Sequence, residues 1–157
     1  MTAILSPCGR YRYRLERDLA GGRGACAFIM LNPSTADATT DDSTIRRCIG
    51  YARTWGYAKL IVGNAYAWRS TDPDELWTTA DPFGPANDDH LASIIADAEL
   101  LVCGWGTDAK PEHGLRVRDL IVKAGKVPHA LKLNKDGSPG HPLYLRRNLT
   151  PFPWSSP

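Results

Sequence analysis

Three mostly apolar runs, separated by segments of helical periodicity, constrain the fold of this chain more than any other feature. The runs are residues 25–31 (ACAFIML), 59–66 (KLIVGNAY) and 99–105 (ELLVCGW). A continuous apolar run of this length is typical of a strand that is covered on both faces. Parallel strands need such cover, and the helices that connect them provide it. The sequence therefore predicts an α/β protein with a mostly parallel central sheet.

The segments between these runs carry apolar residues at helical spacing. A helix is predicted from residue 43 to about residue 55, and two more over 87–98 and 114–125. Ser43 and Asn87 fit the N-cap positions of the first two helices, because their side chains can accept a hydrogen bond from the first turn. Helices on both faces of the sheet give a three-layer α/β/α sandwich.

Further elements are expected around this centre. Residues 11–19 alternate apolar and charged side chains, which predicts a half-exposed strand that pairs antiparallel at one edge of the sheet. Residues 128–134 are predicted to form a fourth, partly alternating strand, and residues 71–77 a short helical turn. The length is typical of one domain. We expect a single domain over 1–157, with a proline-rich tail over about 144–157.

The composition limits the possible partners. The net charge is only +2, so any nucleic-acid surface must be local. None of the four cysteines forms a C-x-x-C pair, which is typical of a reduced, cytoplasmic protein. No apolar run approaches the length of a membrane span, so no membrane partner is expected. The oligomeric state is not predicted.

The arginines near the N-terminus are expected to be solvated: Arg10, Arg12, Arg14, Arg17 and Arg23.

Four polar loops follow the predicted parallel strands. They are residues 32–37, 64–72, 104–110 and 134–142. In open α/β sheets, ligands bind beyond the carboxyl ends of the strands. The four loops are therefore expected to converge on one pocket.

Three side chains in these loops are the main candidates for contact with a ligand. Asn32 is held by the proline that follows it and offers both a donor and an acceptor, or else it ties its own turn. His141 lies in a loop stiffened by glycine and proline, from which it can donate to a developing negative charge. Trp105 can stack on a nucleobase, or it can be a core residue.

Three acids precede the first predicted helix. Asp37, Asp41 and Asp42 can supply a general base or bind a divalent cation. The alternative is that Asp41 and Asp42 cap the helix, which leaves Asp37 as the candidate base. The spacing of histidine and cysteine does not indicate zinc, and no cofactor is predicted.

Four stretches together resemble a known family. They are 29–48 (IMLNPSTADATTDDSTIRRC), 62–73 (VGNAYAWRSTDP), 102–106 (VCGWG) and 140–145 (GHPLYL). They resemble the bacterial and phage family DUF1643, the domain of unknown function 1643. The order of strand, Asn-Pro loop, helix and late His-Pro loop is also similar, more weakly, to the uracil-DNA glycosylase superfamily.

The second resemblance implies a uracil-DNA-glycosylase-like fold and hydrolysis of an N-glycosidic bond. Asn32 would then position the attacking water, and His141 would contact an oxygen of the departing base. Asp37, the candidate base of the same loop, is expected to help Asn32 orient that water. The chain departs from the glycosylase pattern in three places, one of which is that no aromatic residue follows soon after the first motif, where uracil is expected to stack. Ser34 stands where the mismatch-specific branch has glycine, and Leu143 stands where the uracil-specific branch has serine.

The sequence thus predicts a protein that recognises or processes a nucleobase, a nucleotide or DNA. The alternatives are a non-catalytic nucleic-acid or nucleotide binding module, and a metal-dependent enzyme that uses the three acids. Stacking on tryptophan and phosphate contacts by arginine are expected in the first two cases. The predicted binding residues are Ser34, Asn64, Trp68, Arg69, Trp105, Arg146 and Arg147.

Overall fold

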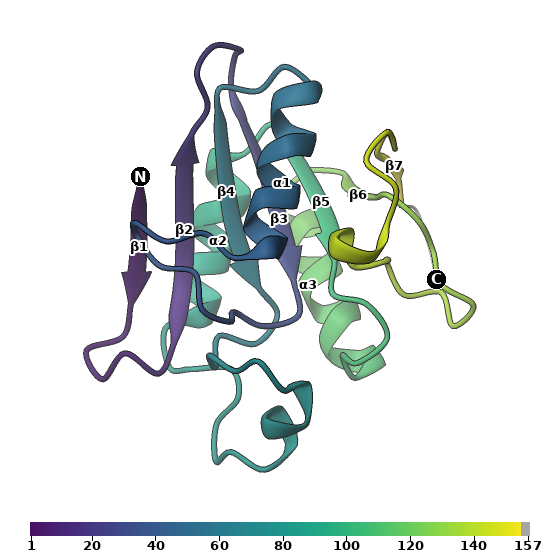
Figure 1. Ribbon diagram of the computed structural model, residues 1–157. Helices are drawn as coiled ribbons and strands as arrows, with labels where there is room; N and C mark the ends of the chain where they lie inside the picture. The colour runs from purple at the N-terminus through teal and green to yellow at the C-terminus, as the bar shows by residue number, and fades with distance from the viewer. Residues whose placement is uncertain (155–157) are drawn as a thin grey trace.

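A seven-stranded sheet lies between two layers of helices in the computed structural model, which describes residues 1–154 (Figure 1). The strand order is β1-β2-β4-β3-β5-β6-β7. The strands are β1 (Thr2–Leu5), β2 (Arg12–Asp18), β3 (Ala25–Met30), β4 (Lys59–Asn64), β5 (Leu100–Gly104), β6 (Pro128–Ala130) and β7 (Phe152–Pro153). The helices are α1 (Ser43–Thr54), α2 (Asn87–Asp97) and α3 (Pro111–Lys123), with 3-10 helices η1 (Pro73–Trp77) and η2 (Pro142–Tyr144).

The four central strands β4, β3, β5 and β6 run parallel, as the apolar runs predict. The sheet as a whole is mixed, because β1, β2 and β7 pair antiparallel outside them. The antiparallel direction of β2 was predicted, but its place at the edge is wrong. Its outer side pairs with β1, a four-residue strand too short to give a sequence signal.

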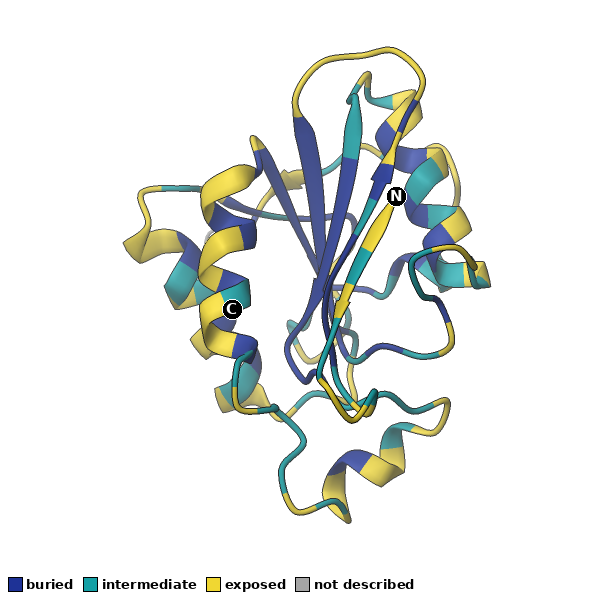
Figure 2. Cartoon of the chain, turned by 90° about the vertical axis from the view of Figure 1, so that its left-hand side faces the viewer, coloured by how far each residue is buried: buried dark blue, intermediate teal, exposed yellow. Residues whose placement is uncertain are grey.

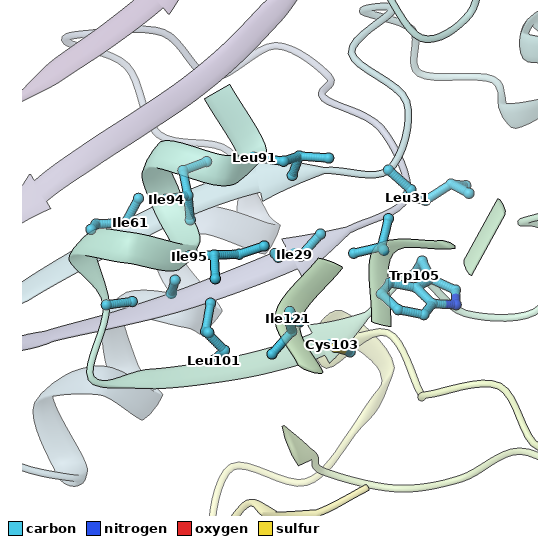
Figure 3. Close-up of a cluster of buried hydrophobic side chains, with 14 of the residues drawn as sticks. Ile29, Leu31, Ile61, Leu91, Ile94, Ile95, Leu101, Cys103, Trp105 and Ile121 are labelled. Atoms are coloured by element: carbon cyan, nitrogen blue, oxygen red, sulfur yellow. The ribbon is translucent and has the colours of Figure 1, made fainter. Parts of the chain in front are cut away.

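The helices cover both faces of the sheet, so the three-layer arrangement is confirmed. On one face, α1 packs Ile45, Cys48 and Tyr51 against alternate residues of the strands. On the other, α2 and α3 pack Ile94 and Ile121 against the opposite set (Figure 3). Figure 2 shows the buried strands between the two layers, whose exposed residues face outward. Within residues 1–154, every helix is too short or too polar to cross a bilayer.

The structure corrects the predicted caps Ser43 and Asn87, and it confirms the other prediction, that Asp42 caps the first helix. Asp42, not Ser43, caps α1, and its carboxylate accepts from the backbone N–H of Ile45 at 2.9 Å. Asn87 is the first residue of α2 and not its cap. Its buried side chain donates to the backbone carbonyl of Asn64 at 3.0 Å, so it holds the carboxyl end of β4 instead. Short polar residues can serve either purpose, and only the neighbouring strand decides between them.

Three arginines of β2 are buried, contrary to the expectation that they are solvated. The reason is that β2 is an interior strand. Arg14 reaches Asp97 of α2 at 2.9 Å, and Arg17 reaches Asp41, before α1, at 2.8 Å. Burial lowers the pKa of Arg12 to about 10, which still leaves its guanidinium charged at neutral pH. These cations therefore fasten β2 to both helical layers.

Candidate functional site

The loops that follow the four parallel strands meet at one edge of the sheet, at the bottom of Figure 1, as the sequence predicts. They enclose a cleft of about 380 Å³. This volume lies within the range of roughly 300–1,000 Å³ that is usual for small-molecule sites. Residues from all four loops line the cleft, among them Asn32, Ser34, Thr71, Trp105, Asp108 and His141.

Asn32 combines the two roles that its sequence context suggests. Its Nδ2 donates to the backbone carbonyls of Pro33, Trp68 and Ser70 at 3.2, 3.3 and 3.1 Å, and so ties the loops after β3 and β4 together. Within residues 1–154, its Oδ1 has no hydrogen-bond partner. Because the amide group is held by its nitrogen, Oδ1 is a fixed acceptor in the lining of the cleft.

His141 is a fixed hydrogen-bond donor in the same lining. It is the N-cap of η2, and its Nδ1 accepts from the backbone N–H of Leu143 at 3.2 Å. Burial lowers the pKa of the imidazole, although Asp42 and Asp108 oppose the shift. The ring is therefore neutral at neutral pH, and since Nδ1 is an acceptor, the proton lies on Nε2.

Tyr144 is a site residue that the sequence analysis missed. Its side chain is 82% exposed although it lines the cleft. Its ring lies 5.6 Å from the ring of His141, with 48° between the two planes. The sequence signal was the spacing of three residues after the histidine, which places both side chains on one side of a 3-10 turn.

Trp105 is a core residue, and this corrects its proposed role as a stacking surface. The residue is only 3% exposed. Its indole packs edge-to-face on Trp154 at 5.6 Å and lies against Gly114 of α3. Trp105 continues the alternation of Leu101 and Cys103 toward the face covered by α2 and α3. Only part of it borders the cleft, so no face of the ring is free for a nucleobase.

The three acids serve the loop before α1 and do not line the cleft. Asp37 accepts from the backbone N–H groups of Thr39 and Thr40 at 3.0 and 2.9 Å, and these hydrogen bonds lower its pKa. Asp41 pairs with Arg17, and Asp42 caps α1. Among residues 1–154, no group of three His, Cys, Asp or Glu side chains is placed to hold a metal ion. The donor set that the metal-dependent alternative requires is therefore not assembled.

The remaining predicted residues lie outside the cleft. Trp68 and Arg69 line a neighbouring hollow of about 440 Å³, and Arg147 lines another of about 460 Å³. Asn64 is buried at the end of β4, and its side-chain amide has no partner within residues 1–154. The Arg146 side chain is exposed, and its backbone carbonyl accepts from the hydroxyl of Tyr51.

The fold and the cleft define an α/β sandwich protein with a candidate binding site at the carboxyl edge of its parallel strands. The chain belongs to the DUF1643 family, because the family model described as "Protein of unknown function (DUF1643)" matches residues 12–143. Neither the curated proteins nor the solved structures gave a match. The similarity to uracil-DNA glycosylases therefore rests on the sequence motifs alone.

The lowered pKa of His141 predicts a pH dependence of stability. In the unfolded chain the imidazole protonates near its ordinary pKa of about 6.5, whereas the folded protein takes up this proton only at lower pH. Between the two values the unfolded chain binds more protons, so the free energy of unfolding falls as the pH is lowered. We expect His141→Asn to flatten this dependence by up to about 1.4 kcal/mol per pH unit, measured by urea unfolding across that pH range.

The matched control for this experiment is His129→Gln, which changes a histidine of β6 outside the cleft. Burial also lowers the pKa of His113, so part of the pH dependence should remain in the His141→Asn variant. Equal flattening by both variants would contradict the role given to His141.

Proposed function

We propose that the cleft binds the base of a nucleotide or of a nucleic acid, and that its candidate reaction is hydrolysis of the N-glycosidic bond. One observation carries this proposal: a fixed acceptor, Asn32 Oδ1, and a fixed donor, His141 Nε2–H, line the same cleft of about 380 Å³. Nucleobases present carbonyl oxygens next to N–H groups, so they need both kinds of partner.

The exposed ring of Tyr144 supports a planar ligand. An aromatic side chain that is left in water at the border of a polar cleft offers a surface on which a base can stack. Such stacking contributes about 1–3 kcal/mol per base. Tyr144 therefore takes the stacking role that the sequence analysis gave to Trp105.

The lining also suits the chemistry of N-glycosidic hydrolysis. A water molecule held by Asn32 Oδ1 attacks the anomeric carbon, and the electron pair of the breaking bond passes to the base. His141 Nε2–H donates to the base oxygen on which the negative charge develops. Asp108, the carboxylate in the lining, accepts the proton that the water loses in this proposal. The acid thus comes from the loop after β5 and not from Asp37.

The test has a binding arm and a turnover arm. Fluorescently labelled mononucleotides measure affinity, and base-modified DNA oligonucleotides together with free nucleosides report abasic products and released base. Tyr144→Ala should weaken binding about 5- to 150-fold, and Tyr144→Phe should keep it, because stacking needs the ring and not the hydroxyl. Both variants should fold, since this side chain lies in solvent.

His141→Asn separates chemistry from structure. Asparagine is a good N-cap, so the hydrogen bond from Leu143 N–H is kept while the donor at Nε2 is removed. Turnover should fall at least about 100-fold, the usual effect of removing one donor to a developing oxyanion. If the protein binds these ligands but hydrolyses none of them, it is a non-catalytic binding module. Neither binding nor turnover with any of these substrates would refute the proposal.

A further inference from the structure

The cleft has a basic hollow on each side. The α1 hollow, of about 460 Å³, is lined by Arg46, Arg47 and Arg147, and it shares Leu143 with the cleft. The β1–β2 hollow, of about 440 Å³, is lined by Arg10 and Arg69. It shares Ser34, Ser70 and Thr71 with the cleft. The three depressions are therefore neighbours along one border of the molecule, with the cleft in the middle.

The arginines of the two hollows have no acidic partners. Within residues 1–154, none of the five forms an ion pair with a carboxylate. By contrast, Arg14, Arg17 and Arg116 all do. The positive charge of a protein with a net charge of only +2 is thus left unneutralised at these two places.

What holds these guanidinium groups is neutral. In the α1 hollow, Arg46 donates to the backbone carbonyl of Asp41 at 3.1 Å, and Arg47 donates to that of Pro142 at 3.4 Å. In the β1–β2 hollow, Arg69 donates to the carbonyls of Ser34 and Gly9 at 3.3 and 3.2 Å. Arg10 lies over the ring of Trp68 at 5.5 Å. Such contacts orient a guanidinium and leave its charge available to an anion.

From this arrangement we infer that a single strand of nucleic acid crosses the cleft, with one base inside and backbone phosphates in both hollows. The inference rests on the proposed function and names the form of its substrate. A free nucleotide carries its phosphate on one side of the base, so it can fill only one hollow. A polynucleotide continues on both sides, and it alone uses both sets of arginines.

Two features favour a single strand over a duplex. The acceptor of Asn32 and the donor of His141 contact base edges that pairing in a duplex occupies, and Tyr144 needs an unstacked face. The middle of the path also carries an acid. Asp108 lines the cleft, whereas among residues 1–154 no acidic side chain lines either hollow. Phosphates are therefore directed away from the centre to the two hollows.

The experiment compares four labelled probes by fluorescence anisotropy at several salt concentrations: a mononucleotide, a single-stranded oligonucleotide of about eight nucleotides, the matching duplex, and an anionic lipid vesicle. The oligonucleotide should bind at least about tenfold more tightly than the mononucleotide. Its affinity should fall steeply with salt, with a logarithmic slope of about −0.7 for each phosphate contact. The duplex and the vesicle should bind more weakly than the oligonucleotide.

Variants test each hollow separately. Arg46→Gln with Arg147→Gln should weaken oligonucleotide binding about tenfold and reduce the magnitude of the salt slope by about 1.4, and Arg10→Gln should reduce it by about 0.7. The affinity for a nucleoside without phosphate should not change. Arg23→Gln is the matched control, because this exposed arginine lies in the turn between β2 and β3, outside the three depressions.

The outcomes separate this inference from the function on which it rests. Equal affinity for mononucleotide and oligonucleotide, with dependence on Tyr144, would overturn the strand path and leave the base site standing. Tighter binding of the duplex or the vesicle would also overturn the path, and so would an equal effect of Arg23→Gln. Binding that needs the arginines of both hollows but ignores Tyr144 and His141 would overturn the base site instead.

Discussion

Replacing Arg17 with alanine is expected to lower the free energy of unfolding by about 4 kcal/mol. Its side chain is among the most buried in the protein, with the residue only 1% exposed. Nε pairs with Asp41 at 2.8 Å. The terminal nitrogens donate to the backbone carbonyls of Glu16, Asp37 and Thr40. The alanine variant would leave the partly exposed carboxylate of Asp41 and several backbone carbonyls without their donor, and each buried acceptor left unpaired costs about 1–3 kcal/mol.

The substitution should also affect the candidate site, because Arg17 holds the loop before α1, and this loop carries Asn32 and Ser34. Urea unfolding followed by circular dichroism measures the change. Arg17→Lys keeps the charge but supplies fewer, differently directed donors, so we expect it to be intermediate. Arg53→Ala, at the exposed end of α1, is the control and should change stability by less than about 0.5 kcal/mol. A loss below about 1 kcal/mol for Arg17→Ala would show that the loop is held by other contacts.

Gly22→Ala is expected to lower the free energy of unfolding by about 3 kcal/mol. The turn between β2 and β3 passes close to the end of α1, where a Cβ at Gly22 would lie 2.6 Å from the carbonyl oxygen of Gly56 and from the backbone of Tyr57. Because these neighbours are backbone atoms, they cannot move away from the added Cβ as the end of a flexible side chain could. The φ of +81° at Gly22 adds the strain of the left-handed region for alanine.

The neighbouring glycine separates these two effects. Gly21 also has a positive φ, of +96°, but a Cβ there would meet no atom within 4 Å. Gly21→Ala should therefore cost only the backbone strain, about 1–2 kcal/mol. Thermal and urea unfolding of both variants give the comparison. If both variants lost the same free energy of unfolding, the turn would have moved away from α1 at no cost, and the predicted steric clash at Gly22 would be contradicted.

The parallel direction of β3, β4 and β5 could be predicted because each is a mostly apolar run and helices connect them. The edges of the sheet could not be predicted, since β1 and β7 have only four and two residues, and only their partner strands give them a ladder. The arginines of β2 were predicted to be exposed, and they are buried because elements from distant parts of the chain cover them. Alternating charge predicts an exposed face, and nothing local shows that β1, α2 and the loop before α1 will cover it.

The candidate site was predicted in part. Asn32 and His141 were singled out because proline and glycine hold them at the ends of strands, and both line the cleft. Trp105 was weighed as a ligand residue although the period of two of its strand already directs it to the face covered by α2 and α3. Tyr144 was missed because its exposure depends on where η2 comes to lie.

By itself, the sequence determined the alternation of buried strands and helices, and with it the edge of the sheet at which polar loops must gather. Local pattern is sufficient for this, because periodicity and proline act over a few residues. Only the tertiary structure decided that, within residues 1–154, Oδ1 of Asn32 and Nε2 of His141 have no hydrogen-bond partner. It also decided that the five arginines of the two hollows have no carboxylate partner there. Partners of this kind come from segments that are distant in the chain, and hydrogen bonds and ion pairs depend on their final distances.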